Sequence, residues 1–312
     1  MTTTSGPRSA AARRAAAARR AAAERRRSRV RWAAAAGGVV LAGAGVTALV
    51  VGIAGSGGES AGGAGPRIGG DLHTVTVVGD SLYAGGHTAV AVSRNGGRTW
   101  RTIPSLAGAD VMGWAVTPAA VLVGGHPGLY RSTNGGATFA PVTGPAAVND
   151  AHALGGSGST LYIGQTSSGL LRSTDGGRRW QVRNPDVGQM LMGTIEVDPA
   201  DPDRLLVPDM SSGLMLSTDG GRSFSPLGGP AGAMTAAWNP RDVDEIVAVG
   251  SNDGGRSSDG GKTWQSIPTP AGTSALTYSS DGRTLYAGAV DDRQQVQIYR
   301  SIDGGTSWTT TG

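Results

Sequence analysis

Apolar and polar residues alternate in short stretches from about residue 69 to the end of the chain. Val75 and Val77, and then Leu82 and Ala84, occupy every second position, which is the period of a β-strand with one buried face. Similar apolar runs recur as "AVLVGG", "TLYIGQ", "RLLVPD", "EIVAVGS" and "TLYAGA". Segments that contain Gly and Pro separate them. The pattern therefore predicts an all-β domain of many short strands.

One eight-residue box repeats six times within this pattern. The copies read "SRNGGRTW", "STNGGATF", "STDGGRRW", "STDGGRSF", "SSDGGKTW" and "SIDGGTSW", and their serines are Ser93, Ser132, Ser173, Ser217, Ser257 and Ser301. Successive serines lie 39, 41, 44, 40 and 44 residues apart, and a period near forty with four short strands is typical of propeller blades. We therefore expect a six-bladed β-propeller over residues 69–312, in which each blade supplies its own strands. The expected blades are 69–106, 107–145, 146–183, 184–228, 229–269 and 270–312.

The box is expected to form the turn between the third and fourth strands of each blade. Its paired glycines supply the positive φ that a tight turn requires. Its Ser and its Asp or Asn bond to turn amides, and its Trp or Phe packs against the blade. Two copies carry Asn95 and Asn134, and an amide serves in a turn but not as an acid or base. The box is therefore interpreted as structural.

The N-terminal part differs in composition from the rest of the chain. Residues 1–31 contain ten Arg and one Glu, whereas the remaining 281 residues carry 17 basic and 22 acidic side chains. The positive charge thus belongs to a tail and does not indicate a nucleic-acid partner. Residues 32–55 are uncharged and long enough for a transmembrane helix, and residues 56–68 form a Gly/Ser-rich linker. The Arg-rich flank predicts a single-pass protein of the cell membrane, with a cytoplasmic N-terminus and an extracytoplasmic propeller; a cleaved signal peptide is the alternative.

The repeated box resembles the Asp-box, or BNR, repeat of sialidase-like propellers. Within that group, the segments "DLH" at 71–73, "VMGW" at 111–114 and "GGHPG" at 124–128 are similar to small membrane-anchored bacterial Asp-box proteins that are catalogued as glycosyl hydrolases. The resemblance implies the propeller fold and a glycan-directed function. Sialidase activity is not expected, because three arginines must converge on the substrate carboxylate and only Arg293 is expected on the face opposite the boxes.

That face, called here the top face, should hold the start of each first strand and each turn between second and third strands. All four His of the chain fall there. His73 and His152 occupy equivalent positions in first strands, and His87 and His126 occupy equivalent positions in the turns. We expect His73 and His152 to approach the axis and share one site, flanked by the two turn histidines. Glu196 is expected to face the central channel from an inner strand. The candidate catalytic residues are Asp71, Asp150 and Glu196, and the candidate ligand-binding residues are His73, His87, His126, His152, Asp110, Trp114 and Asp209.

Different chemistries fit these residues. Imidazoles with carboxylates suit a divalent metal such as Zn²⁺ or an acid–base network, whereas repeat duplication would leave the same residues at equivalent positions without any site. Two carboxylates about 5–10 Å apart would suit a glycoside hydrolase. Two function classes therefore stay open: a glycan-directed protein of glycosyl-hydrolase type, and a non-enzymatic module that binds a glycan or protein ligand or assembles partners at the cell surface.

Overall fold

The computed structural model describes residues 65–187 and 191–312. Within these ranges no helix has the length and apolar character needed to cross a membrane. The expected tail at 1–31 and the expected transmembrane helix at 32–55 lie outside the described residues, as does most of the linker at 56–68.

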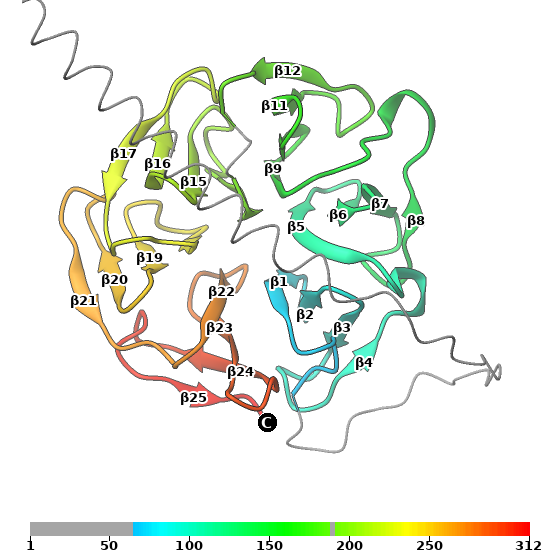
Figure 1. Ribbon diagram of the computed structural model, residues 1–312. Helices are drawn as coiled ribbons and strands as arrows, with labels where there is room; N and C mark the ends of the chain where they lie inside the picture. The colour runs from blue at the N-terminus through cyan, green and yellow to red at the C-terminus, as the bar shows by residue number, and fades with distance from the viewer. Residues whose placement is uncertain (1–64, 188–190) are drawn as a thin grey trace, which may run out of the picture. The chain divides into compact units, whose positions relative to one another are not determined.

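Six sheets surround a central axis (Figure 1): five have four antiparallel strands, and the third has a fifth strand that the next blade contributes. Blades one to three contain β1 (Leu72–Val78), β2 (Ser81–Gly86), β3 (Val90–Ser93), β4 (Arg101–Thr102), β5 (Asp110–Val116), β6 (Val121–His126), β7 (Leu129–Ser132), β8 (Ala140–Pro141), β9 (Ala153–Ser157), β10 (Thr160–Gln165), β11 (Gly169–Ser173) and β12 (Gln181–Asn184). Blades four to six contain β13 (Gly193–Thr194), β14 (Glu196–Val197), β15 (Leu205–Asp209), β16 (Gly213–Ser217), β17 (Ser225–Gly228), β18 (Thr235–Trp238), β19 (Ile246–Val249), β20 (Gly254–Ser257), β21 (Gln265–Ile267), β22 (Thr273–Tyr278), β23 (Leu285–Val290), β24 (Val296–Ser301) and β25 (Thr309–Thr310). Two 3₁₀ turns, η1 (Pro104–Leu106) and η2 (Gly144–Ala146), lead into blades two and three. The six-bladed all-β prediction is confirmed, and the strands of each blade follow one another in the chain.

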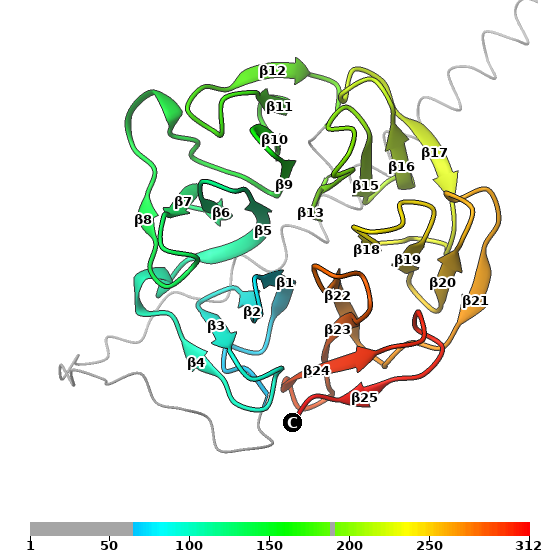
Figure 2. The same ribbon diagram turned by 180° about the vertical axis from the view of Figure 1, so that it is seen from behind.

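The first strand of blade four is split into two pieces. Its first piece, β13, pairs in parallel with β9 of blade three, whereas β14 pairs antiparallel with β15 of its own blade. Figure 2 shows β13 beside β9 at the centre of the ring. The inner strand of blade three is therefore covered on its axial side by blade four.

Apolar clusters between adjacent blades hold the ring together. Leu72 and Val75 of β1 pack with Ala275, Val296 and Ile298 of blade six, so the first and last blades meet directly. The Oγ of Ser274 also donates a hydrogen bond to the carbonyl of Leu72, at 2.8 Å. Burial of these side chains, at about 25 cal/mol per Å² of apolar surface, closes the ring without a shared strand.

Each box forms the same turn. In blade three the Ser173 hydroxyl donates to Oδ1 of Asp175 at 2.9 Å and accepts the amide of Gly177 at 2.9 Å. Both glycines of this box have positive φ, 71° and 80°. The copies with Asn95 and Asn134 make the corresponding bonds. All six copies therefore serve the same turn.

Candidate functional site

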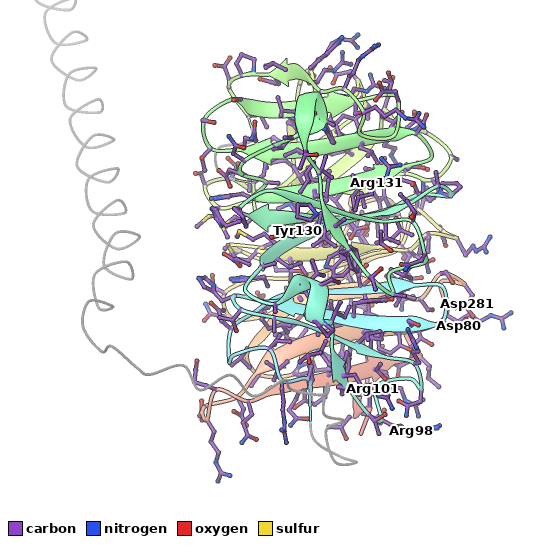
Figure 3. The ribbon with its side chains drawn as sticks, turned by 90° about the vertical axis from the view of Figure 1, so that its right-hand side faces the viewer. Asp80, Arg98, Arg101, Tyr130, Arg131 and Asp281 are labelled. Carbon is purple, nitrogen blue, oxygen red and sulfur yellow. The ribbon has the colours of Figure 1, made fainter. Side chains whose placement is uncertain are left out.

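The two faces of the propeller are distinguished by their turns. Asp80 and Asp281 lie in turns between first and second strands, and Arg98 lies in the first box. Figure 3 shows these three side chains toward the same side of the propeller. The top face is the opposite one, with the starts of the first strands and the turns between second and third strands.

Blades one to three bring all four histidines of the chain and three aspartates together on the top face. Asp71 lies directly before β1, Asp110 begins β5, and Asp150 lies shortly before β9. The cluster is completed by His73 in β1, His152 just before β9, His87 in the β2–β3 turn and His126 at the end of β6. We call these seven residues the His/Asp cluster.

Two local features direct these side chains. The pairing of β1 with β2 shifts register between Leu72 and Thr74, so His73 sits in a bulge, and bulges re-aim side chains. A Cβ on Gly125 would lie 1.6 Å from the Asp110 carbonyl oxygen, and one on Gly86 would lie 2.1 Å from that of Asp71. The glycine that precedes each turn histidine therefore lets the carbonyl group of the neighbouring aspartate approach the second strand closely.

The first group of donor atoms comes from blade one. Nε2 of His73 lies 2.9 Å from Nδ1 of His87. Oδ2 of Asp71 lies 3.3 Å from the same His87 nitrogen and 3.6 Å from the His73 nitrogen. These three atoms form a triangle, called here triad one.

The second group joins blades two and three. Nε2 of His126 lies 3.2 Å from Nε2 of His152. Oδ1 of Asp150 lies 3.2 Å from the first nitrogen and 3.1 Å from the second. We call this group triad two. The Thr166 hydroxyl donates to the other Asp150 oxygen at 3.0 Å, and the Gln165 amide donates to the Asp150 carbonyl at 2.7 Å.

Asp110 lies between the two triads. Its Oδ1 is 3.3 Å from Nε2 of His73 and 3.8 Å from Nδ1 of His87. Its Oδ2 is 3.2 Å from Nδ1 of His126. If this Nδ1 carries the proton and donates to Asp110, the lone pair of His126 Nε2 points into triad two.

The four histidines do not surround one site that His73 and His152 share. The two inner-strand histidines lie in different triads, each with a histidine of a turn. The structure therefore replaces the expected shared site with two adjacent groups. Each group offers two imidazole nitrogens and one carboxylate oxygen, a donor set that suits a divalent metal ion.

An axial cavity of about 360 Å³ opens beside triad one. Asp71 and His73 contribute to its wall, and so do Met112, Met192 and Met234. The hydroxyl-bearing residues Thr74, Thr194, Thr235, Thr273 and Ser274 complete its polar lining. None of the triad two residues lines this cavity, in keeping with the cover of β13 over β9.

The placement of Trp114 corrects the sequence prediction. Its side chain is 2% exposed and packs with Tyr83 and Phe139 between blades one and two. Its indole N–H donates to the Thr74 hydroxyl at 2.9 Å. Trp114 is therefore a core residue, because its face of β5 turns toward blade one and away from solvent.

Glu196 and Asp209 also lie apart from the cluster. Glu196 lies on β14 and does not line the axial cavity; burial raises the pKa of its carboxyl to about 8, and the amide of Trp238 opposes this by bonding to it. Asp209 ends β15 and accepts the amides of Ser211 and Ser212 at 2.9 and 2.8 Å. It therefore holds its own turn.

Sequence reasoning missed Thr166 and Met234. Thr166 occupies the turn position of His87 and His126 when the second strands are aligned on the box serines, so alignment of the repeats could have indicated it. Met234 precedes β18 and could have been found in the same way, from its position at the start of a first strand.

No protein-family model and no curated protein sequence matches this chain. Among solved structures it is similar to the GH74 xyloglucanase of Xanthomonas campestris, with a TM-score of 0.53 and 20% identity over 80% of this chain and 46% of that one. It is also similar to the Niastella koreensis GH74 enzyme, with a TM-score of 0.52 and 14% identity over 81% of this chain and 55% of that one. YCF48 from Cyanidioschyzon merolae has a TM-score of 0.51 and 13% identity over 77% of this chain and 84% of that one. The chain spans about half the length of the two GH74 structures, and at these identities the likeness shows the β-propeller fold alone.

Proposed function

We propose that this chain is a non-enzymatic binding propeller, held on the outer side of the cell membrane, that takes an apolar side chain of a protein ligand into the axial cavity. The observation that carries the proposal is the lining of the cavity by Met112, Met192 and Met234 together with hydroxyl groups. Flexible, polarizable thioethers adapt to differently shaped apolar groups and are common on peptide-binding surfaces. Met234 is 46% exposed, which suits contact with a partner.

The number of carboxyl groups in the cavity favours binding over hydrolysis. Among the described residues that line it, Asp71 is the single acidic side chain. A glycosidase of the usual type needs two carboxyl groups on either side of the scissile bond. The cavity thus supplies one of the two groups, which supports a ligand-binding role.

The cavity methionines allow a matched test. We expect the full-length chain to select peptides with an apolar anchor from a displayed peptide library, and Met234→Asp to abolish that selection by placing a charge in the cavity. Met210 provides the control, because it is 45% exposed but does not line the cavity. Equal loss of binding in Met210→Asp and Met234→Asp, or no selection by the unmodified chain, would argue against the proposal.

The membrane part of the proposal rests on the sequence of the N-terminal region. Residues 32–55 are uncharged, and Arg-rich residues 1–31 precede them, which favours a cytoplasmic N-terminus. We expect the intact protein in the membrane fraction, with residues after 56 open to external protease. Recovery of a soluble mature form that lacks residues 1–55 would contradict the anchor.

Glycan hydrolysis is the second candidate, and Glu196 is the observation that favours it. A carboxyl whose pKa is raised to about 8 by burial is protonated at neutral pH and suits a general acid. Asp71 and Asp150 are the candidate partners. In this case the full-length chain should release reducing ends from a polysaccharide panel that includes xyloglucan, and Glu196→Gln should abolish the release; no release by the unmodified chain would exclude this candidate.

A further inference from the structure

We propose that the His/Asp cluster binds two divalent transition-metal ions, one in each triad, and that Asp110 couples the two sites. The inference goes beyond the proposed ligand binding and does not depend on it. It rests on the separations between donor atoms, on two buried carboxylate oxygens and on the charge of the cluster.

The separations are those that an ion imposes on its ligands. Bonds of about 2.0–2.1 Å in a tetrahedral zinc site place the donor atoms about 3.3 Å apart. In triad one the three separations are 2.9, 3.3 and 3.6 Å. In triad two they are 3.2, 3.2 and 3.1 Å. Each triangle can therefore hold one ion with little movement of its side chains.

Two carboxylate oxygens support the same conclusion. Oδ1 of Asp110 and Oδ1 of Asp150 are buried and have no hydrogen-bond partner, although imidazole nitrogens lie 3.1–3.3 Å from them. These nitrogens are close enough, but the angles do not suit hydrogen bonds. An uncompensated buried carboxylate oxygen is costly, and a cation within each group would satisfy it.

The charge of the cluster points the same way. Asp71, Asp110 and Asp150 together carry three negative charges when ionised, whereas a neutral imidazole contributes none. Within residues 65–187 and 191–312, the ion pairs of these aspartates are all with histidines and none is with Lys or Arg. Two divalent cations would more than balance these charges.

The two sites would differ in their ligands. Asp110 Oδ1 lies outside the compact donor group of triad one, at 3.3 Å from the His73 nitrogen and 3.8 Å from the His87 nitrogen, and would move toward the ion to become its fourth donor. Triad two has three donors, which leaves a coordination position for water or for a ligand atom. Asp110 Oδ2 would orient His126 through its Nδ1, as carboxylates commonly do for metal-bound histidines. One residue would thus bind the first ion and position a ligand of the second.

The composition of the chain restricts where a metal ion can bind through histidine or cysteine. It has four His and no Cys, and all four His belong to the cluster, so imidazole-dependent binding can arise nowhere else. We would use the full-length chain without a histidine tag and measure bound Zn²⁺ by equilibrium dialysis, with Co²⁺ substitution to report coordination through its visible absorption bands. We expect two ions per chain.

Single substitutions separate the two sites. His87→Ala, at an exposed turn, should remove the ion of triad one, and His152→Ala should remove the ion of triad two, leaving one ion in each variant. Asp110→Asn should weaken both, with a loss of about 10–100-fold in the affinity of triad two, the range seen when a group that orients a metal ligand is lost. Asp209→Asn is the matched control, because an amide oxygen can still accept the amides of Ser211 and Ser212.

The outcomes decide between distinct readings. Two ions in the unmodified chain and one in each histidine variant support the proposal. A single ion that both histidine variants lose would show one shared site and overturn it, as would no binding at micromolar Zn²⁺. If Asp110→Asn behaves like Asp209→Asn while two ions bind, the coupling through Asp110 is wrong. Because no peptide is present, failure here leaves the proposed ligand binding untouched.

Discussion

Replacement of Trp114 tests whether this residue belongs to the core or to a binding surface. The indole is 2% exposed, contacts Tyr83 at a centroid distance of 5.3 Å and Phe139 at 6.0 Å, and donates to Thr74 at 2.9 Å. Thr74 is itself 2% exposed. Trp114 therefore joins blade one to blade two through both apolar contacts and one buried hydrogen bond.

The expected cost has two parts. Trp114→Ala removes the ring and leaves a cavity, which should lower the free energy of unfolding by about 3–5 kcal/mol. Trp114→Phe keeps a ring beside Tyr83 but loses the N–H donor, and Thr74→Val leaves that donor unpaired, so each should cost about 1–3 kcal/mol. The double variant removes both polar partners. It should therefore cost less than the sum of the two single changes, with a coupling of about 1 kcal/mol.

Urea unfolding, followed by circular dichroism, measures the stability of the unmodified full-length chain and of the four variants. Zinc dialysis on the same samples provides the functional readout, and it should change little for Trp114→Phe. Strictly additive effects of Trp114→Phe and Thr74→Val would contradict the buried hydrogen bond. A Trp114→Phe variant of normal stability that had lost ligand or metal binding would show that Trp114 acts at the site after all.

Three further predictions concern a box aspartate, the buried carboxyl of Glu196 and the backbone beside Asp110. A hydrogen bond from the Thr263 hydroxyl is the main cause of the lowered pKa of Asp259, which is about 2. The Asp259 carboxylate should therefore contribute fully to stability above about pH 4, and this contribution should be lost as the pH falls toward 2. Asp259→Asn should reduce the fall in melting temperature between about pH 4 and pH 2. The same fall in both proteins would refute this role of the Asp259 carboxylate. Burial raises the pKa of Glu196 to about 8, so stability should decline by up to about 1.4 kcal/mol per pH unit between pH 4.5 and 8. Glu196→Gln should remove that decline in urea titrations at pH 5 and 8, and an equal decline in both proteins would exclude it. Gly125→Ala, whose Cβ would meet the Asp110 carbonyl oxygen, should lower the free energy of unfolding by about 2–3 kcal/mol and weaken zinc binding; a variant with normal melting would show that the backbone can move aside.

The fold could be predicted because its signals are local. Each blade contains its own strands and its own box, so the alternation of apolar residues and the spacing from Ser93 to Ser301 are enough to count six blades. The role of the box could also be inferred, because paired glycines and a short polar side chain are what such a turn needs. The Asn boxes at Asn95 and Asn134 make the same bonds as the Asp boxes.

The contacts between blades could not be predicted in the same way. Both faces of an inner strand are buried against neighbouring blades, so alternation alone could not show that Trp114 faces Tyr83. The pairing of His73 with His87 depends on the bulge in β1 and on the close approach of the Asp71 backbone to Gly86. Glu196 was expected to face the channel from its inner strand, but the split of that strand into β13 and β14 was not visible in the sequence.

The distribution of the histidines argues against simple repeat inheritance. Blade one has histidine at both the strand and the turn position, His73 and His87, and these two meet at 2.9 Å. Blade two has Met112 at the strand position and keeps only the turn histidine, whereas blade three has Thr166 at the turn position and keeps only the strand histidine. The two remaining histidines, His126 and His152, meet each other across the boundary between blades at 3.2 Å. Duplication alone does not explain why the histidines kept in blades two and three are the two that contact each other. Two sites with two histidines each require this arrangement.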